Sequence, residues 1–549
     1  MSKRITKGIL LLTVISLGIG SFAFTKYNDV YFLIKKNFTI FSEVYREVSL
    51  RYVDEVNPEK LMRKGLNAML TALDPYTVLI DESQTEQFDI ITTGTYGGVG
   101  IEVGYKRGKM VVIAPIEGYA AYEKGIKAGD IILSVNDMDL TRLTAEEVQN
   151  VMYGEPGTTV SLKIKRFGFE EPLEFTLERQ RIEVQNIAFE GFIGPDNNIG
   201  YIVLNRFSQN TADEIRTAIE DLKKNEDLNG LVLDLRNNPG GLLNEAVKTI
   251  DKFVKPGIEL VKTKGRVAEN NSVYKSTEPA IAPDLPVVIL QNGGSASASE
   301  VVAGSLQDLD RAIVLGEPSF GKGLVQVIKP LSYNTALKMT VSKYYIPSGR
   351  SIQSRTYTHD EYNSVLMQPD STKLFYSTRN GRKVFGGEGI IPDIQVSEKK
   401  PSSFQMELMR HSHYFFFANE YVSQVDTSDF PDKENLIDAF STYLEGQGFE
   451  FETDTEILFT RLERKLAFYR LTDKQISGIN SIENIIEKEK RKLINLEKED
   501  TYNKVKAELL KRLYNKNRQI QFSTETDRYL SEAIKLIQNK TRYNTILLP

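Results

Sequence analysis

The sequence predicts a multidomain protein of the α/β class, and three observations carry this prediction. The chain has 549 residues, more than one hydrophobic core supports, so about three to four domains are expected. Its central part, from about 191 to 396, alternates short apolar runs with amphipathic helical segments, which is typical of a layered domain with parallel strands. After about Lys399 glycine becomes rare and long Leu/Ile/Lys/Glu segments indicate helices.

The alternation can be followed element by element through the central region. Strands are expected at 199–204, 230–235, 287–291 and 312–315. Helices are expected at 211–224, 242–254 and 297–309. Apolar residues recur at helical spacing in the first of these helices, where they are Ala212, Ile215, Ile219 and Leu222. Each expected strand ends in a loop that can carry chemistry.

Other modules flank this central domain, which is assigned to residues 181–398. Residues 26–93 predict an N-terminal helical subdomain that closes on the turn Leu73-Asp74-Pro75-Tyr76, and residues 94–180 predict a small β-domain. Residues 399–549 predict a helical C-terminal domain, in which 474–513 reads as charged amphipathic helix. A homo-oligomer contact through this domain is one hypothesis, and a solvated helix face is the other.

The N-terminus carries the features of an export segment, assigned to residues 1–25. Three basic residues, Lys3, Arg4 and Lys7, precede an apolar run at 9–24. This run is shorter than the about 20 residues that span a bilayer, and Ser21 and Ala23 form a small-x-small pair typical of a cleavage site. A cleaved signal peptide and a retained membrane anchor both stay open, and a buried helix of a cytoplasmic protein is the alternative.

Composition excludes several classes of chemistry. The chain has no cysteine, so disulfides and thiolate nucleophiles are excluded. A net charge of -5, from 69 basic and 74 acidic residues, gives no overall attraction to nucleic acid. A mechanism with a histidine base has three candidates, which are His359, His411 and His413.

A serine-rich segment at 292–300, Asn-Gly-Gly-Ser-Ala-Ser-Ala-Ser-Glu, follows an apolar strand and runs into a helix. Ser297 therefore stands at a helix N-terminus, where unpaired backbone N–H groups and the helix dipole favour an oxyanion. The alternative is that Ser295, Ser297 and Ser299 only cap the helix.

A lysine between two glycines, Gly321-Lys322-Gly323, follows the next expected strand. Removal of water from Lys322 would lower its pKa and let the neutral amine accept a proton, and Gln326 lies four residues further on. The alternative is an exposed lysine on a turn. The string is not a phosphate-binding P-loop, because Gly-x-x-x-x-Gly-Lys-Ser/Thr is absent.

A third segment, Asp234-Leu235-Arg236-Asn237-Asn238-Pro239-Gly240-Gly241, lies between an expected strand and helix. Its two glycines expose backbone N–H groups, which suit one half of an oxyanion hole. A simple strand-to-helix turn is the alternative.

Two glycine-containing stretches in the β-domain have a specific pattern, namely Gly98-Val99-Gly100-Ile101 and Lys127-Ala128-Gly129-Asp130-Ile131-Ile132. Their order resembles a PDZ domain, whose carboxylate-binding loop would be Gly98, Val99, Gly100 and Ile101. Glycines let consecutive N–H groups turn inward around a terminal carboxylate. A mere tight turn at Gly98 and Gly100 is the alternative.

Together these segments resemble the C-terminal processing peptidases, or tail-specific proteases, over most of residues 40–397, including the closing Gly387-Glu388-Gly389-Ile390-Ile391-Pro392-Asp393. The resemblance implies a crotonase-like α/β core and a serine endopeptidase that cuts exported proteins near their C-terminus. It implies Ser297 as nucleophile, Lys322 as base with Gln326 beside it, and an oxyanion hole from Ala298 and Gly240 or Gly241.

The same resemblance implies partners, cofactors and location. The partners would be proteins with accessible C-terminal tails, no metal or cofactor would be needed, and the site of action would be the bacterial periplasm or the outer face of the inner membrane. Tyr76 stands where many relatives have histidine, and the region beyond 400 matches no part of the family.

Two rival functions can be weighed on the residues alone. A His-Asp-Ser protease needs a histidine ahead of Ser297, and none exists, while a Gly-x-Ser-x-Gly elbow is absent from 293–299. An inactive PDZ scaffold is the rival from another class, and the intact set of Ser297, Lys322 and Gln326 argues against it.

Overall fold

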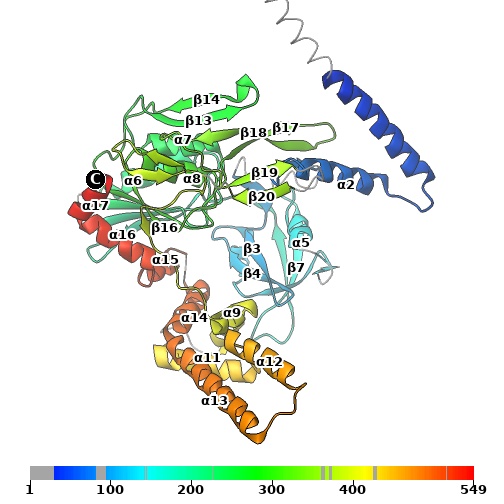
Figure 1. The fold of residues 1–549 in the computed structure, drawn as a ribbon, viewed down its shortest axis with the longest axis vertical. Coiled ribbons are helices and arrows are strands. Elements are labelled where there is room, and N and C mark those ends of the chain that lie inside the picture. Colours follow the sequence, from blue (N-terminus) through cyan, green and yellow to red (C-terminus); the bar gives the residue numbers. More distant parts are fainter. Residues whose placement is uncertain are drawn as a thin grey trace, which may run out of the picture. The chain divides into compact units, whose positions relative to one another are not determined.

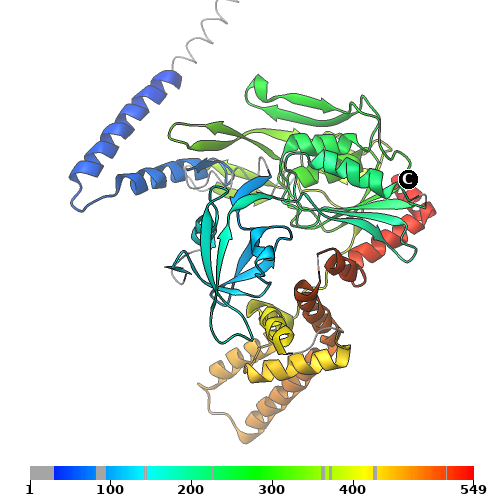
Figure 2. The ribbon, with the colours of Figure 1, turned by 180° about the vertical axis from the view of Figure 1, so that it is seen from behind.

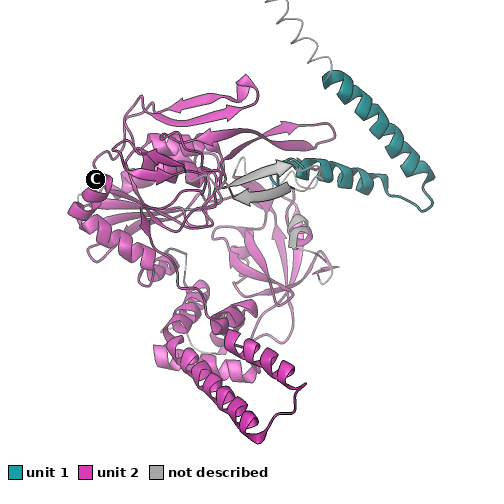
Figure 3. Cartoon of the chain, in the orientation of Figure 1, with its two compact units in different colours: residues 1–79, 359–365 teal, residues 80–358, 366–549 magenta. Residues whose placement is uncertain are grey.

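The computed structural model describes residues 30–81, 94–140, 143, 145–225, 227–359, 365–369, 374–424, 430–514 and 516–548. The chain divides into two compact units, one of residues 1–79 and 359–365 and the other of residues 80–358 and 366–549 (Figure 3). The predicted export segment, residues 1–25, lies outside the described residues. Within the described ranges, no helix is long and apolar enough to cross a membrane.

The described residues of the first unit include two helices and a turn. One helix covers residues 30–51 and the other, α2, covers Pro58–Thr71. Proline is tolerated at the first position of α2, and the Asn57 side chain caps the helix by accepting from the N–H of Lys60 at 3.0 Å. The predicted turn is present, because Asp74 accepts from the N–H groups of Tyr76 and Thr77 at 2.8 Å each.

The centre of the second unit is a six-stranded sheet in the order β10-β11-β12-β15-β16-β23. Strand β10 is antiparallel to β11, and all the other neighbours are parallel. The strands are β10 Ile187–Ile193, β11 Ile199–Leu204, β12 Gly230–Asp234, β15 Val287–Gln291, β16 Ile313–Gly316 and β23 Ile394–Gln395. The four strands predicted in this region are confirmed within one residue at each end.

One face of this sheet is covered by the three predicted helices, α6 Thr211–Leu222, α7 Leu243–Asp251 and α8 Ala298–Asp308 (Figure 1). Alternate residues of each strand, such as Ile202, Leu233 and Ile289, are buried with these helices in one core. The strand residues between these, such as Tyr201, Val232 and Val288, belong to a second core on the opposite face, because successive side chains of a strand point to opposite sides of the sheet.

That opposite face is covered by the last two helices, α16 Arg528–Gln538 and α17 Lys540–Leu547 (Figure 2). The side chains of Tyr529, Leu530 and Leu536 are buried there, and each contributes about 1.5–3 kcal/mol by leaving water. Tyr543 adds a hydrogen bond, since its hydroxyl donates to the Val287 carbonyl at 3.0 Å. The end of the chain is therefore part of the central α/β layer.

The small β-domain has a sheet in the order β3-β4-β5-β7-β8, with its own apolar core. Two strands outside this order, β2 and β9, pair with each other, and β6 pairs with β5. The elements are β2 Thr95–Gly98, β3 Ile101–Lys106, β4 Lys109–Pro115, α4 Ala120–Glu123, β5 Ile131–Val135, β6 Met138–Asp139, α5 Ala145–Met152, β7 Thr159–Lys165, β8 Leu173–Glu178 and β9 Gln180–Glu183. The backbone turns at residues 99–100, between β2 and β3.

A second sheet contains the hairpin β17–β18, and β18 also pairs with β13. The strands of this sheet in the second unit are β13 Glu259–Gly265, β14 Ser272–Lys275, β17 Leu324–Pro330 and β18 Ala336–Tyr345. The short remaining elements are β1 Val78–Ile80, the 3₁₀-helix Ala268–Asn270, β19 Arg355–His359, β20 Val365–Pro369, β21 Phe375–Ser377 and β22 Lys383–Phe385.

Residues 403–424 and 430–513, the described part of this region, form a helical module of six helices with a core of its own. They are α9 Ser403–Arg410, α10 His413–Gln424, α11 Lys433–Gly446, α12 Asp454–Leu466, α13 Asp473–Leu496 and α14 Lys498–Leu513. The stretch read as one charged helix at 474–513 is two helices, which meet at Glu497. Helix α15, Lys516–Thr524, leads from the module to α16.

The helical module packs against the small β-domain through α10. Phe415 and Phe416 share an apolar cluster with Val111 and Ile131 of strands β4 and β5. Asn419 donates to the carbonyl of Gly129 at 3.0 Å. The module therefore contacts the β-domain directly and is continuous with the helices that cover the central sheet.

Candidate active site

The three loops predicted to carry chemistry meet at one edge of the central sheet. Strands β12, β15 and β16 are parallel neighbours, so their carboxyl ends lie at the same edge. The loop 235–242 follows β12, the loop 292–297 follows β15, and the loop 317–323 follows β16. The fold thus brings the predicted oxyanion, serine and lysine segments together.

Ser297 stands at the N-terminus of α8 in a strained backbone conformation. Its φ is 55° and its ψ is -115°, which a non-glycine residue rarely adopts and which costs about 1–3 kcal/mol. Ser297 also forms a capping box with Glu300, and its side chain is half-buried.

The fully buried carboxylate of Glu300 joins the serine and lysine segments. One oxygen, Oε2, accepts from the N–H of Ser297 and from the N–H of Lys322, each at 2.8 Å. The other, Oε1, accepts from the Ser319 hydroxyl at 2.5 Å and from the N–H of Gly321 at 2.6 Å. The backbone N–H groups of Ser297 and Lys322 thus share a single acceptor oxygen.

The electrostatics of Glu300 follow from this arrangement. Burial raises the pKa of Glu300, while the hydrogen bonds from Ser319, Lys322, Gly321 and Ser297 act to lower it. The two carboxylate oxygens of Glu300 accept from four donors, three of which are backbone N–H groups.

The lysine loop is fixed from its other side as well. Gly323 donates to the Gln353 side chain at 2.8 Å, and the Tyr344 hydroxyl donates to the carbonyl of Lys322. The N–H of Ser354 donates to the carbonyl of Gly321 at 3.0 Å. Backbone groups of residues 321–323 are therefore all engaged, so the half-buried Lys322 stands on a rigid loop and not on a loose turn.

Gln326 lies on strand β17, next to an irregularity in its pairing with β18. The register shifts between Val325 and Gln326, which is how a β-bulge redirects a side chain. The Gln326 amide donates to the Thr340 hydroxyl at 3.3 Å. Thr340 thus fixes the amide that the sequence analysis placed beside the lysine.

The glycine loop lies directly against the serine. Gly240 has φ +97°, and its own N–H donates to the side chain of Asn238 at 2.9 Å. Among the described residues, no acceptor is within hydrogen-bonding range of the N–H groups of Gly241 and Ala298. Of the two glycines predicted for the oxyanion hole, Gly241 is therefore the one with an available donor.

Replacing Gly240 by alanine is expected to lower kcat by about 10² because the loop must move away from the serine. A Cβ at this position would lie 2.8 Å from Ser297 Cβ, 2.8 Å from Ala298 N and 2.6 Å from Ala296 O. Gly257→Ala is the matched control, since Gly257 also has a positive φ, +86°, but open space around it. Steady-state cleavage by both variants checks this, and equal rates would contradict the close approach.

The loop predicted to bind a carboxylate separates strands β2 and β3. Gly100 has φ +76°, which suits glycine, and a Cβ there would lie 2.5 Å from the Tyr119 side chain. Within the described ranges, the N–H groups of Val99 and Gly100 find no acceptor. Ile101 begins β3, which forms an edge of its sheet. The loop therefore offers unpaired donors beside a strand edge.

Comparison with known protein families agrees with these motifs. A model of peptidase family S41 matches residues 198–363, a PDZ domain model matches 111–166, and a model described as "Probable PDZ-protease, C-terminal helical domain" matches 404–537. A carboxy-terminal-processing protease of Bartonella bacilliformis is 37% identical over 337 residues, which cover 61% of this chain and 76% of the relative. The chain belongs to the carboxy-terminal processing proteases.

Other members of the family are also similar to this chain. CtpB of Bacillus subtilis is 31% identical over 329 residues, which cover 60% of this chain and 67% of the relative. The solved photosystem II D1 C-terminal processing protease is 27% identical, with a TM-score of 0.37, over 64% of this chain and 85% of that one. This protein is a serine protease of family S41 with a PDZ domain, so the predicted family and enzyme class are confirmed. The expectation that the region beyond 400 matches no part of the family is wrong, because the helical-domain model of a PDZ-protease matches residues 404–537.

The sequence analysis missed several residues that hold the site, above all Glu300, Gln353 and Tyr344. Glu300 could have been found, because a serine followed three residues later by glutamate has the spacing of a capping box. Gln353 and Tyr344 come from distant segments and carry no local pattern. The structure therefore identifies the residues that hold the predicted serine and lysine segments in place.

Proposed function

We propose that this C-terminal processing protease cuts exported proteins near their C-terminus with a Ser297/Lys322 pair, and that its PDZ domain captures the substrate tail. The observation that carries the proposal is the Glu300 carboxylate, whose Oε2 accepts from the backbone N–H groups of both residues at 2.8 Å. A shared anchor of this kind fixes a nucleophile and a base at a common site, which positioning catalysis requires.

In the proposed reaction, the neutral amine of Lys322 accepts the proton of the Ser297 hydroxyl while Oγ attacks the scissile carbonyl carbon. The tetrahedral intermediate collapses when the C–N bond breaks and the lysine returns the proton to the leaving amine. A water molecule then gives a proton to Lys322 while its oxygen attacks the acyl carbon. The C–Oγ bond breaks, Lys322 returns the proton to Ser297 Oγ, and the new carboxyl terminus leaves with Ser297 and the neutral amine restored.

The oxyanion would accept from the backbone N–H groups of Ala298 and Gly241. Both lack an acceptor among the described residues, and Ala298 opens helix α8, whose dipole favours negative charge at that end. Gly240 would act by its small size, because its N–H already donates to Asn238. Gln326 would orient either the amine or the substrate, with Thr340 holding its amide.

Tail capture would use the loop of Gly98, Val99, Gly100 and Ile101. The unpaired N–H groups of Val99 and Gly100 suit a terminal carboxylate, and β3 pairs only with β4 among the described strands. A peptide tail could therefore add to β3 as a further strand, with main-chain hydrogen bonds supplying affinity.

The free carboxylate of the tail is expected to matter for binding. An unfolded reporter polypeptide with a C-terminal amide should show a KM about tenfold or more above that of the free acid, because a charge-assisted hydrogen bond is lost. Gly100→Ala should erase the difference by crowding the loop. Gly108→Ala is the control, since Gly108 has φ +69° and open space. Equal KM values for acid and amide would refute tail capture.

The proposal also includes the predicted location of the protein, the fold of its core and its oligomeric state. Export to the periplasm or the outer face of the inner membrane rests on the basic and apolar residues before Phe24. A crotonase-like core rests on the motifs of the central domain, and a homo-oligomer contact on the helical module. The predicted domain boundaries likewise stay predictions.

A further inference from the structure

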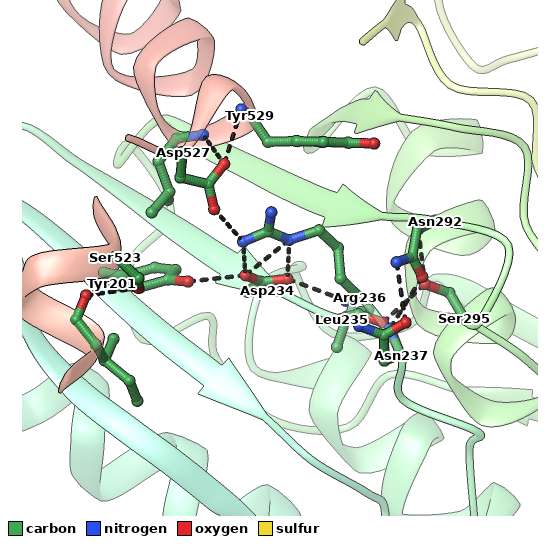
Figure 4. A network of polar contacts seen from close by, with 12 residues as sticks. Tyr201, Asp234, Leu235, Arg236, Asn237, Asn292, Ser295, Ser523, Asp527 and Tyr529 are labelled. Carbon is green, nitrogen blue, oxygen red and sulfur yellow. Dashed lines mark hydrogen bonds and ion pairs between the residues drawn. The ribbon is translucent and has the colours of Figure 1, made fainter. Parts of the chain in front are cut away.

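Arg236 lies between two carboxylates that come from distant parts of the chain (Figure 4). Its guanidinium contacts Asp234 at 2.6 Å and Asp527 at 2.7 Å, and the side chains of Arg236 and Asp527 are each 16% exposed. Burial lowers the pKa of Arg236, but the two aspartates outweigh burial and raise it above its usual value. The arginine is therefore a fixed cation with two partners.

Asp527 is itself held in place by helix α16. Its Oδ1 accepts from the N–H groups of Tyr529 at 2.8 Å and Leu530 at 3.2 Å, so it caps the helix. Its other oxygen, Oδ2, contacts Arg236. The Tyr529 ring lies against the guanidinium, with its centre 5.0 Å from the arginine carbon. The carboxylate of Asp527 thus caps α16 with Oδ1 and binds Arg236 with Oδ2.

Arg236 lies at the start of the 235–242 loop, which carries Gly240 and Gly241. The next residue, Asn237, has φ 57° and exchanges two hydrogen bonds with Asn292, at 2.9 and 3.0 Å (Figure 4). The Ser295 hydroxyl donates to the carbonyl of Leu235 at 2.7 Å. The start of the glycine loop is therefore tied to the serine loop on one side and, through Arg236, to α16 on the other.

We propose that Asp527 is a positioning residue for the oxyanion loop and acts through Arg236. The proposal rests on the function proposed above, since it needs the 237–241 loop to take part in catalysis. Without Asp527, the guanidinium keeps Asp234 and the Tyr529 ring but loses its ion pair to the residue that caps α16, so the start of the glycine loop is held less firmly. Helix α15 connects Asp527 to the helical module, so the C-terminal helices would support the reaction as well as the fold.

The arrangement permits a substitution that separates the two tasks of Asp527. In Asp527→Asn, the amide oxygen can keep the helix cap, because asparagine caps as well as aspartate. The amide nitrogen then faces the guanidinium, so a donor meets a donor and the contact to Arg236 is lost. We expect kcat to fall about tenfold, since small displacements of a catalytic loop reduce rate steeply. KM should change less than about twofold, because the loop acts in the transition state.

The matched control is Glu532→Gln, which removes an ion pair to Arg542 at 2.7 Å on the same helix pair and away from Arg236. This variant should keep both kcat and KM. Thermal unfolding of both variants gives the folded fraction, and rates are compared per folded molecule. An unchanged kcat in Asp527→Asn, or a loss equal to its loss of folded protein, would overturn the proposal.

The outcome can be separated from a failure of the reaction mechanism itself. If Ser297→Ala abolishes cleavage while Asp527→Asn keeps the full kcat, the serine mechanism stands and the positioning role is refuted. If Ser297→Ala still cleaves, the function itself is refuted, and the positioning role is refuted with it. A tenfold loss confined to kcat in Asp527→Asn, with Glu532→Gln unchanged, supports the role.

Discussion

Replacing Ser297 by alanine is expected to lower kcat/KM by on the order of 10⁶, and replacing Lys322 by alanine by on the order of 10⁴ or more. The first change removes the atom that forms the acyl-enzyme. The second removes the group proposed to accept the serine proton. Both segments are held by the backbone contacts to Glu300, which these changes leave in place. Cleavage of an unfolded polypeptide, followed by mass spectrometry, measures both losses.

The effects of replacing Ser297 and Lys322 on kcat/KM should also be non-additive, because the two groups act in the same step. The double variant should be no slower than Ser297→Ala alone, because a base has no role once its nucleophile is gone. Lys322→Arg should be as inactive as Lys322→Ala, since arginine keeps its proton at any working pH and cannot act as a base.

Lys329→Ala provides the matched control, because Lys329 is an exposed lysine on the following strand β17. It should cleave like the unchanged protein. Substantial activity in Lys322→Ala, with the cut positions preserved, would show that another group takes the proton. The family assignment would survive that result, but the proposed dyad would not.

The central strands and helices could be predicted because their residues obey short-range rules. Strand β15, Val287–Gln291, is a run of buried residues between turn signals, and α8 begins where Ser297 ends a small-residue loop. Parallel strands place successive loops at one edge, so the meeting of Gly240, Ser297 and Lys322 followed from the order of the elements.

The packing of α16 and α17 on the central sheet could not be predicted from local sequence patterns. The apolar face of α16, with Tyr529, Leu530 and Leu536, shows that the helix is buried on one side but does not say what covers it. The sequence analysis grouped it with the other C-terminal helices, whereas it packs on the central sheet. The contact between Arg236 and Asp527 likewise depends on tertiary structure, and no local pattern signals it.

The role of Glu300 could be predicted only in part from the sequence. Its spacing from Ser297 suggests a capping box, and its carboxylate accepts from the N–H of Ser297 as that motif requires. Its contacts to Ser319, Gly321 and Lys322 are long-range and were not visible in the sequence. A residue that a local rule explains as a cap thus has a second task that only the fold reveals.

Glu300→Gln is expected to lower kcat by about 10²–10³. Glutamine has nearly the same size, but only one of its two terminal atoms accepts hydrogen bonds. If its NH₂ group faces Ser297 and Lys322, two N–H donors meet another donor. If it faces Ser319 and Gly321, the N–H of Gly321 meets another donor and the Ser319 hydroxyl must turn to accept. One side of the site is then released from its anchor.

Ser319→Ala gives a graded comparison, because it removes one donor to Glu300 and leaves the other three in place. Its loss of kcat should be clearly smaller than that of Glu300→Gln. Circular dichroism and thermal unfolding establish that both variants are folded, and steady-state kinetics then assigns the loss to kcat or KM. If folded Glu300→Gln cleaves at the unchanged rate, the buried carboxylate does not hold nucleophile and base together, and the geometric argument for the Ser297/Lys322 pair loses its main support.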